Sequence, residues 1–224
     1  MSYWKNFWNK AAQSDSALMQ VQRNADDRTL TAIESHICKL LNIKKTDEVL
    51  DVCCGNGLIS TRIAKHCKTV VGVDFSSGLL HSAKEQDLAS NIQFIEEDAI
   101  DLSNSIHQKF DKIILYYSFQ YFDFKQGMQV VSEMKKLLKP GGQMLIGDVP
   151  NKKKFWTYYD TLPKRFLYFK QWLFEQPKMG KFWSEKEMRM LAEENQLKGL
   201  FLQQDKKLPH AHYRFDFLME DKQK

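Results

Sequence analysis

The chain of 224 residues has the length of one domain with a single substantial core, and 43% of its residues are hydrophobic. Its net charge of +5 permits anionic substrates but does not require a nucleic-acid partner. No apolar run approaches the length of a membrane span, and the first residues lack the apolar region of a signal peptide. The four cysteines have no paired spacing, which favours reduced thiols in a cytoplasmic protein over a disulfide or a metal site.

The N-terminal part of the chain predicts two helices. Residues 2–12 carry aromatic side chains at helical spacing, which indicates a helix packed on the body of the domain. A second helix is expected over 25–42, with Asn24 as its N-cap. Its buried stripe consists of Ile33, Ile37, Leu40 and Leu41. His36 lies beside that stripe, so we interpret it as a structural rather than a catalytic residue.

Residues 49–57 form the centre of the pattern. A short apolar run with β-branched residues predicts a buried strand, and this strand contains an acid, Asp51. The strand breaks at Gly55 and Gly57, after which residues 58–64 continue with helical spacing. A strand, a glycine turn and a helix in that order let the backbone come close to a ligand.

A second predicted strand, over 69–74, ends in Asp74. This acid lies at about the distance along the chain expected for a carboxylate that binds ribose. Two classes of cofactor use such a unit. A dinucleotide site needs a third glycine where this chain has Ser60, so a nicotinamide-dependent oxidoreductase is the less favoured alternative.

Further strands and helices alternate along the chain. We expect a helix over 77–88, a strand over 91–96 that runs into Asp98 and Ala99, and a fourth strand over 110–117. The fourth strand is nearly all apolar, so it belongs at the centre of the sheet. Its carboxyl end then lies at the edge where open α/β sheets bind their ligands.

An aromatic insert follows the fifth strand. A helix at about 126–138 stops at the Pro-Gly-Gly of 140–142, and residues 143–149 form the fifth strand. Residues 150–183 then interrupt the alternation with aromatic side chains interleaved with basic ones. Three interpretations are open: an additional helical layer, a cap over the substrate, or a segment that binds a membrane surface. The cap is suggested because the insert leaves the carboxyl end of a strand.

The C-terminal region predicts a helix and a hairpin. Ser184 and Glu187 form a capping box at the start of the helix. Alternating strands over 197–203 and 213–219 flank a long loop. Five parallel strands with helices between them, together with this closing hairpin, make a doubly wound α/β sheet in a single domain that spans the whole chain.

The motifs around the glycine turn and Asp74 resemble those of the class I S-adenosylmethionine-dependent methyltransferases of the small-molecule type. That family has the pattern hydrophobic-L-D-x-G-x-G-x-G in the first segment and V-x-G-x-D-x-S in the second. Residues 137–143 resemble its L-K-P-G-G turn, and the resemblance covers about residues 25–150. Cys53 replaces the first glycine of the pattern, and a small side chain is tolerated there if its φ is negative.

The resemblance implies a Rossmann-like, mostly parallel seven-stranded sheet with strand order 3-2-1-4-5-7-6, in which strand seven is antiparallel. It also implies S-adenosylmethionine as the cofactor. The implied cofactor-binding residues are Asp51, Cys53, Gly55, Gly57, Asp74, Phe75, Asp98, Ala99 and Tyr116. Residues 1–24 would then form a helical flap over the cofactor.

The resemblance also assigns roles within this site. Asp74 would accept hydrogen bonds from the ribose hydroxyls, while Asp98 and the Ala99 amide would hold the edge of the adenine. The two glycines would let the backbone approach the methionine part of the cofactor. Asp51 would help to hold the amino group, and Tyr116 would lie close to the same end.

The chemistry requires few protein groups. The methyl sulfonium is already a reactive electrophile, so the protein has to align an acceptor and exclude water. A hydroxyl acceptor must also lose its proton, a task that suits a histidine. His210 and His212 lie in the loop after strand six, on the ligand side of the sheet; the alternative is that both are exposed loop residues. We expect no metal, since Asp148 after strand five is a lone candidate ligand.

The segment after the fourth strand narrows the class of acceptor. Enzymes that methylate exocyclic amines of nucleic-acid bases usually carry [NDS]-P-P-[YFW] there, whereas this chain has Tyr116-Tyr117-Ser118-Phe119. We therefore expect in-line transfer to a small-molecule, sugar or lipid-linked acceptor, at a hydroxyl, and no nucleic-acid partner. An RNA methyltransferase and a protein that binds the cofactor without turnover are the alternatives.

Overall fold

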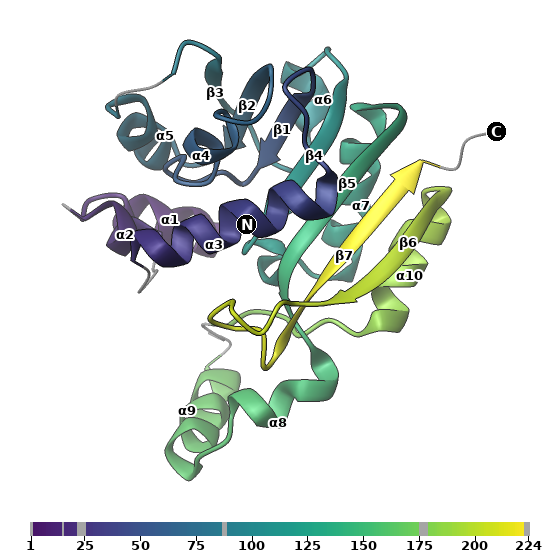
Figure 1. Cartoon of the computed structure of the whole chain (residues 1–224). Coiled ribbons are helices and arrows are strands. Elements are labelled where there is room, and N and C mark those ends of the chain that lie inside the picture. The colour runs from purple at the N-terminus through teal and green to yellow at the C-terminus, as the bar shows by residue number, and fades with distance from the viewer. Residues whose placement is uncertain (1, 15, 22–25, 87–88, 175–178, 222–224) are drawn as a thin grey trace.

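The computed structural model describes residues 2–14, 16–21, 26–86, 89–174 and 179–221. Its centre is a seven-stranded sheet in the order β3-β2-β1-β4-β5-β7-β6 (Figure 1). The strands are β1 (Glu48–Val52), β2 (Thr69–Asp74), β3 (Ile92–Glu96), β4 (Phe110–Tyr116), β5 (Leu138–Pro150), β6 (Leu197–Gln203) and β7 (Arg214–Asp221). Strands β1 to β5 pair in parallel, and β7 pairs antiparallel with both β5 and β6. The predicted strand order and the closing hairpin are therefore confirmed.

Helices cover both faces of this sheet. The α-helices are α1 (Ser2–Ala11), α2 (Ala17–Gln20), α3 (Asp27–Leu41), α4 (Ser60–Ile63), α5 (Ser77–Lys84), α6 (Leu102–Ser105), α7 (Phe124–Lys136), α8 (Phe155–Tyr158), α9 (Leu162–Leu173) and α10 (Glu185–Glu194). Two short 3-10 helices are η1 (Phe119–Tyr121) and η2 (Lys152–Lys154). In Figure 1, α3 crosses in front of the sheet while α7 and α10 lie behind it.

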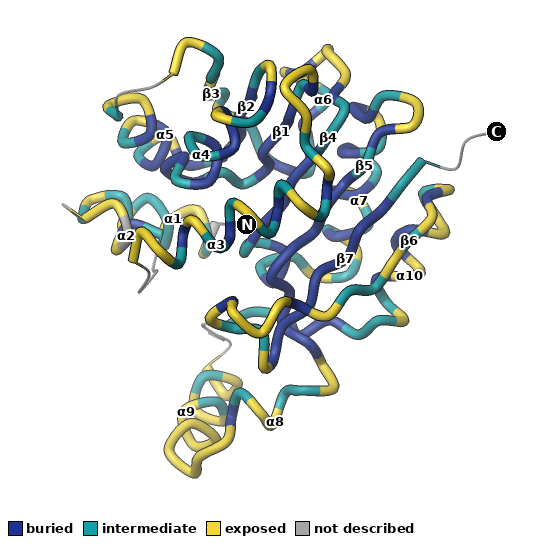
Figure 2. Tube along the Cα trace, viewed as in Figure 1, coloured by how far each residue is buried: buried dark blue, intermediate teal, exposed yellow. Residues whose placement is uncertain are grey.

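The two faces of the sheet build two separate cores, because successive side chains of a strand point to opposite sides. In β4, Ile113 and Leu115 pack in one core together with α6, α7 and α10. Their neighbours Ile114 and Tyr116 pack in the other core, together with α3. Figure 2 shows the resulting buried strands in dark blue at the centre of the molecule. This arrangement explains why the predicted fourth strand is apolar along nearly its whole length.

Two local predictions differ from the structure. The predicted N-cap Asn24 lies outside the described residues; α3 is capped instead by Asp26, whose Oδ1 accepts a hydrogen bond of 2.8 Å from the Thr29 amide. The helix α7 ends at Lys136, before the predicted stop at the Pro-Gly-Gly of 140–142, and residues 140–142 lie within β5 rather than in a turn. The register of β5 against β4 shifts there, which lets an irregular stretch of backbone join the strand.

The insert after β5 contains η2, α8 and α9. Its inner side chains pack with the C-terminal loop in a small aromatic cluster built on Tyr159, Phe182 and Tyr213. The predicted capping box after the insert is confirmed, because Ser184 Oγ accepts from the Glu187 amide while Glu187 Oε2 accepts from the Ser184 amide at 2.8 Å. The described part of the insert thus packs its inner side against the C-terminal loop.

Candidate active site

A cavity lies at the carboxyl end of β1, next to the end of β4. Its open space is about 260 Å³, part of which is continuous with solvent. The lining residues are Val21, Asp51, Cys53, Cys54, Asn56, Leu58, Ile59 and Tyr116. The structure thus brings together the predicted residues Asp51, Cys53 and Tyr116 from two neighbouring strands. Parallel strands end at one edge of the sheet, and this is where such folds place their ligands.

The backbone of the turn has an unusual conformation at three positions. Gly55 and Gly57 have φ angles of 58° and 75°. A Cβ on Gly57 would lie 2.6 Å from the ring of Phe94, so this position requires glycine for two reasons. Cys53 has φ of 58°, which contradicts the expectation of a negative φ. A cysteine therefore occupies a left-handed position where the family pattern has glycine, at a cost of about 1–2 kcal/mol.

Asp74 holds the glycine turn in place. Its Oδ2 accepts a hydrogen bond of 2.9 Å from the Gly55 amide, and its Oδ1 accepts one of 2.9 Å from the Ser76 amide. The side chain is buried, and this burial raises the pKa of Asp74 to about 6. A carboxylate has about four acceptor sites, so Asp74 retains capacity for the two hydroxyls of a ribose. These contacts fit the role that the motif implied.

Ser60 has a function that the sequence pattern did not predict. Its hydroxyl donates a hydrogen bond of 2.6 Å to Asp51 Oδ2, and both residues are buried. The sequence pattern identifies Ser60 only as the residue that replaces the third glycine of a dinucleotide motif. In the structure it orients the carboxylate of Asp51, which lines the cavity. The sequence contains a hint of this contact, because Ser60 is the first residue of α4, the helix that follows the glycine turn.

The predicted adenine-binding segment also lies at this edge. Asp98 is half-buried, its Oδ1 accepts a hydrogen bond of 3.2 Å from the Ile100 amide, and the neighbouring Ala99 is buried. Burial raises the pKa of the Cys53 thiol, and the charges of Asp74, Asp98 and Asp51 raise it further. The charges of all three carboxylates therefore reach the Cys53 side chain in the turn. Phe75, which follows Asp74, is half-buried at the same edge.

The N-terminal helices lie over the turn. Asn56 Nδ2 donates to the Ala17 carbonyl at 2.7 Å and to Gln20 Oε1 at 2.9 Å, which ties α2 to the glycine turn. Ser76 Oγ donates to Asn9 Oδ1 of α1 at 2.7 Å. Val21 forms part of the cavity wall. The N-terminal segment therefore encloses one side of the cavity.

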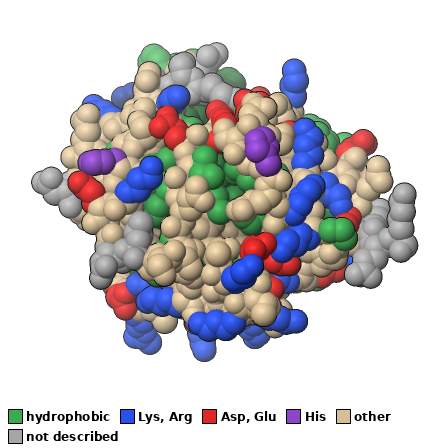
Figure 3. All heavy atoms as spheres, turned by 90° about the horizontal axis from the view of Figure 1, so that it is seen from above, with side chains coloured by type: hydrophobic (Ala, Val, Ile, Leu, Met, Phe, Trp, Pro, Cys, Tyr) green, Lys and Arg blue, Asp and Glu red, His purple; other side chains and the backbone are tan. Residues whose placement is uncertain are grey.

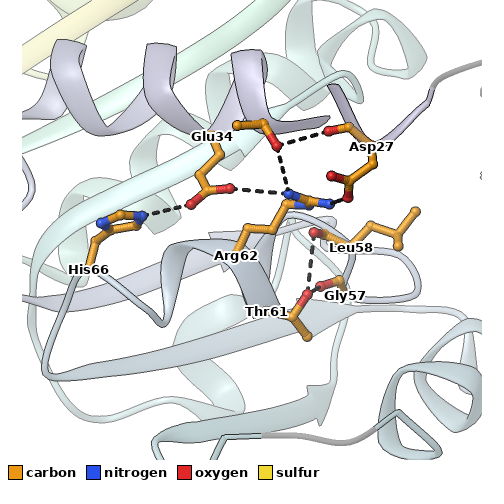
Figure 4. Close-up of polar contacts among 8 residues, drawn as sticks. Asp27, Glu34, Gly57, Leu58, Thr61, Arg62 and His66 are labelled. Carbon is orange, nitrogen blue, oxygen red and sulfur yellow. Dashed lines mark hydrogen bonds and ion pairs between the residues drawn. The ribbon is translucent and has the colours of Figure 1, made fainter. Parts of the chain in front are cut away.

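A charged network fixes the start of α4 against α3 (Figure 4). The guanidinium of Arg62 reaches both Asp27 and Glu34 of α3, and Glu34 Oε1 lies 2.7 Å from His66 Nε2. Thr61 Oγ1 donates to the Gly57 carbonyl at 2.9 Å. These contacts hold the helix that follows the glycine turn, so they position the site without lining its cavity.

The two candidate catalytic histidines lie in different surroundings. His210 is half-buried, and its ring centroid is 6.3 Å from that of Tyr117, the residue that follows β4. His212 is exposed, and its ring packs edge-on against Tyr213 at 4.8 Å. His210 thus has a ring contact with the residue that follows β4.

A buried polar cluster at the ends of β5 and β7 was not predicted. Asp148, the lone metal candidate of the sequence, forms an ion pair of 2.8 Å with Arg214. The Asp148 amide donates to Asp216 Oδ1 at 2.8 Å, and Asp216 Oδ2 lies 2.7 Å from His36 Nε2. Gln204 Nε2 donates to Asp148 and Asp216. The partners are far apart in sequence, so only the fold brings them together; the described residues contain no group of three or more histidines, cysteines or acids placed to hold a metal ion.

Comparison of the sequence and the fold with those of known proteins identifies similar proteins. Residues 49–142 match the family model described as "Methyltransferase domain". These residues thus carry the methyltransferase domain, and the chain has the fold of the class I S-adenosylmethionine-dependent methyltransferases, as the motifs predicted. The cofactor of that class is S-adenosylmethionine.

Particular relatives share part or all of this domain. The 2-phytyl-1,4-naphtoquinone methyltransferase of Trichormus variabilis is 32% identical over 130 residues, which are 54% of this chain and 55% of the relative. The demethylmenaquinone methyltransferase of Staphylococcus epidermidis is 27% identical over 185 residues, which are 75% of this chain and 71% of the relative. The chain spans about half the length of the first curated relatives it matches.

Solved structures match over almost the whole chain. N-methyltransferase NodS from Bradyrhizobium japonicum in complex with S-adenosyl-L-homocysteine has a TM-score of 0.68 at 16% identity and covers 97% of this chain and 98% of its own. Magnesium protoporphyrin IX methyltransferase from Synechocystis with bound S-adenosyl-L-homocysteine has a TM-score of 0.66 at 14% identity, with 98% and 99% covered. At these identities the two structures establish the fold.

Proposed function

We propose that this protein transfers the methyl group of S-adenosylmethionine to a hydroxyl of a small-molecule, sugar or lipid-linked acceptor by in-line displacement. The observation that carries the proposal is the placement of three carboxylates at one edge of the sheet: Asp51 lines the cavity, Asp74 accepts from the Gly55 amide, and Asp98 follows β3. Acceptors for an amino group, a ribose and an adenine are therefore present at one sheet edge. No described residue that lines the cavity is basic, which disfavours RNA as the acceptor.

The residues of the turn would hold the cofactor. When bound, S-adenosylmethionine supplies a sulfonium methyl group that is already reactive toward nucleophiles. Asp74 would accept from the ribose hydroxyls, and Asp51, oriented by Ser60, would accept from the ammonium group. Asp98 and the Ala99 amide would bind the adenine edge. The backbone at Gly57 would approach the methionine part, in a conformation with φ of 75° that favours glycine.

Alignment and exclusion of water would supply most of the rate. Holding the reactants in line can contribute roughly 7–11 kcal/mol. The helices α1 and α2 already lie over the turn and would exclude water once the cofactor has entered. For that entry the wall formed by Val21 has to move, so we propose that residues 1–24 act as a flap.

The acceptor side has a base and a cap. His210 would take the proton of an acceptor hydroxyl, directly or through one water, while His212 is the second candidate. We propose that residues 150–183 cap this side, because Tyr158 packs at 4.9 Å on Tyr213 in the segment that carries both histidines. Two relatives are named for quinones, one of them with a phytyl chain, which favours a lipid-linked ring among the acceptors considered.

A label-transfer screen tests the proposed reaction. The full chain would be incubated with S-adenosylmethionine that carries an isotopically labelled methyl group and with separate lipid, sugar and polar-metabolite fractions. Mass spectrometry would then identify the labelled product and the acceptor atom. We expect a labelled methyl ether in the lipid fraction. A labelled carbon or nitrogen would contradict the hydroxyl acceptor, and absence of transfer to any fraction, with the cofactor bound, would support the alternative of a binding protein without turnover.

A further inference from the structure

Helix α9 directs an apolar stripe toward solvent. Leu162, Phe166, Phe169 and Leu173 follow one another at intervals of four, three and four residues, so they lie on one face of the helix. Their exposed fractions are 79, 74, 55 and 70%. Figure 1 shows α9 projecting from the body at the bottom of the view, and Figure 2 shows it exposed along most of its length. A contiguous apolar surface of this kind marks an interaction site.

The orientation of this apolar stripe is fixed by contacts on the other side of the helix. The ring of Tyr168 is half-buried and packs against Phe155 at 5.0 Å and Tyr159 at 4.9 Å. Arg165 Nε donates a hydrogen bond of 3.0 Å to the Tyr159 carbonyl. The helix is therefore anchored by one face, and the apolar stripe lies on the face that points away from the protein.

The segment that carries the apolar stripe has an excess of positive charge. The basic residues of η2 and α9 are Lys152, Lys153, Lys154, Lys164, Arg165 and Lys170. Between residues 152 and 174 there is one acid, Asp160, which pairs with Lys164 at 2.8 Å. The excess of five positive charges in this segment equals the net charge of the entire chain. In contrast, the face seen from above in Figure 3 carries lysine and arginine side chains interspersed with acidic ones.

We propose that α9 docks on an anionic lipid bilayer, with the apolar stripe at the boundary of headgroups and acyl chains and the basic residues among the headgroups. Helices with an apolar face and a basic rim bind such interfaces. A second copy of this chain is a poorer partner, because two segments with an excess of five positive charges would repel each other. The twelve residues of α9 extend about 18 Å, less than a bilayer core, so the helix would lie on the membrane. None of the described helices is long and apolar enough to cross one.

Vesicle sedimentation tests this proposal. The full chain would be mixed with vesicles of pure phosphatidylcholine and with vesicles that contain one third phosphatidylglycerol. The test variant is the double substitution Phe166→Ser and Leu173→Ser. The control is Met190→Ser and Leu200→Ser, which removes two exposed apolar side chains from α10 and β6 instead. Circular dichroism and thermal unfolding would show that both variants fold as the wild type does.

The outcomes separate membrane binding from self-association. We expect the wild type and the control to bind the anionic vesicles at least about tenfold more tightly than the neutral ones, with binding reduced by salt. Replacing the two stripe residues should lower the partition coefficient about 100-fold. Failure of the wild type to sediment, or equal binding by the stripe variant, would overturn the proposal. So would a lipid-free dimer in analytical ultracentrifugation that only the stripe variant dissociates.

Discussion

Replacing Asp74 with asparagine should weaken the binding of S-adenosyl-L-homocysteine strongly while keeping the size of the side chain. The two carboxylate oxygens accept from the Gly55 and Ser76 amides, and in the proposed complex they would also accept from ribose hydroxyls. Asparagine has one acceptor oxygen and no charge, so at least one charge-assisted bond is lost. Such a bond contributes about 1.5–3 kcal/mol, which corresponds to a dissociation constant raised roughly 10- to 150-fold.

The pKa of Asp74 adds a signature in pH. Burial raises this pKa to about 6 in the free protein, and in the proposed complex the ribose hydroxyls would donate to the ionised carboxylate. Affinity of the wild type should therefore be constant above about pH 7 and fall as the pH drops through 6, because the protonated acid has lost acceptor capacity. The Asp74→Asn variant should lack this dependence. Titration calorimetry at several pH values measures both effects.

The raised pKa of Asp74 also makes the stability of the fold depend on pH, and this stability decreases with rising pH whereas the affinity for the cofactor increases. The folded-state pKa of Asp74 exceeds its value of 3.8 in the unfolded chain, so between pH 4 and 6 the folded state binds more protons. The contribution of Asp74 to the free energy of unfolding should therefore decrease by about 3 kcal/mol as the pH rises from 4 to above 6. Asp205→Asn, in an exposed loop, is the matched control.

The binding prediction for Asp74 has a clear refuting result. A dissociation constant of Asp74→Asn for S-adenosyl-L-homocysteine within threefold of the wild type at pH 7.5 would show that Asp74 does not hold the cofactor.

Three further predictions concern catalysis, stability and metal. Replacing His210 with alanine should lower the turnover number about 10²–10⁴-fold with little effect on cofactor affinity. The wild-type rate should fall in acid as the imidazole gains a proton. Near-normal turnover of His210→Ala would contradict this role and leave His212 as the candidate base. Gly57→Ala should lower the free energy of unfolding by about 1–3 kcal/mol in a denaturant titration, because the φ angle of Gly57 is 75° and the ring of Phe94 blocks a Cβ. An unchanged midpoint would contradict this prediction and show that the Phe94 ring moves aside. Turnover should survive EDTA, and a loss that magnesium restores would contradict a metal-free reaction.

Much of the fold could be predicted because its signals are local and periodic. The apolar runs of β1, β2 and β4, the acids Asp51 and Asp74 near the ends of the first two, and the capping box at Ser184 each depend on a few adjacent residues. The order of the strands came from the family resemblance rather than from periodicity. Within the site, Asp51 and Asp74 could be identified in the same way, because each lies in a strand that the motif includes.

The remaining features depend on contacts between distant parts of the chain. The pairing of Asp148 with Arg214 and of His36 with Asp216 requires β5, β7 and α3 to meet, and no local pattern encodes that meeting. The positive φ of Cys53 is set by the turn around it, and the residue type pointed the other way. In the same way, nothing in residues 2–12 alone shows that they cover the turn.

The central claim is that the turn at residues 53–57 with its three carboxylates binds S-adenosylmethionine. Isothermal titration of the full chain with S-adenosyl-L-homocysteine, and separately with NAD, at pH 7.5 tests it most directly. We predict saturable one-to-one binding of S-adenosyl-L-homocysteine and no heat of binding with NAD. Tight binding of NAD, or no binding of S-adenosyl-L-homocysteine by folded protein, would contradict the account.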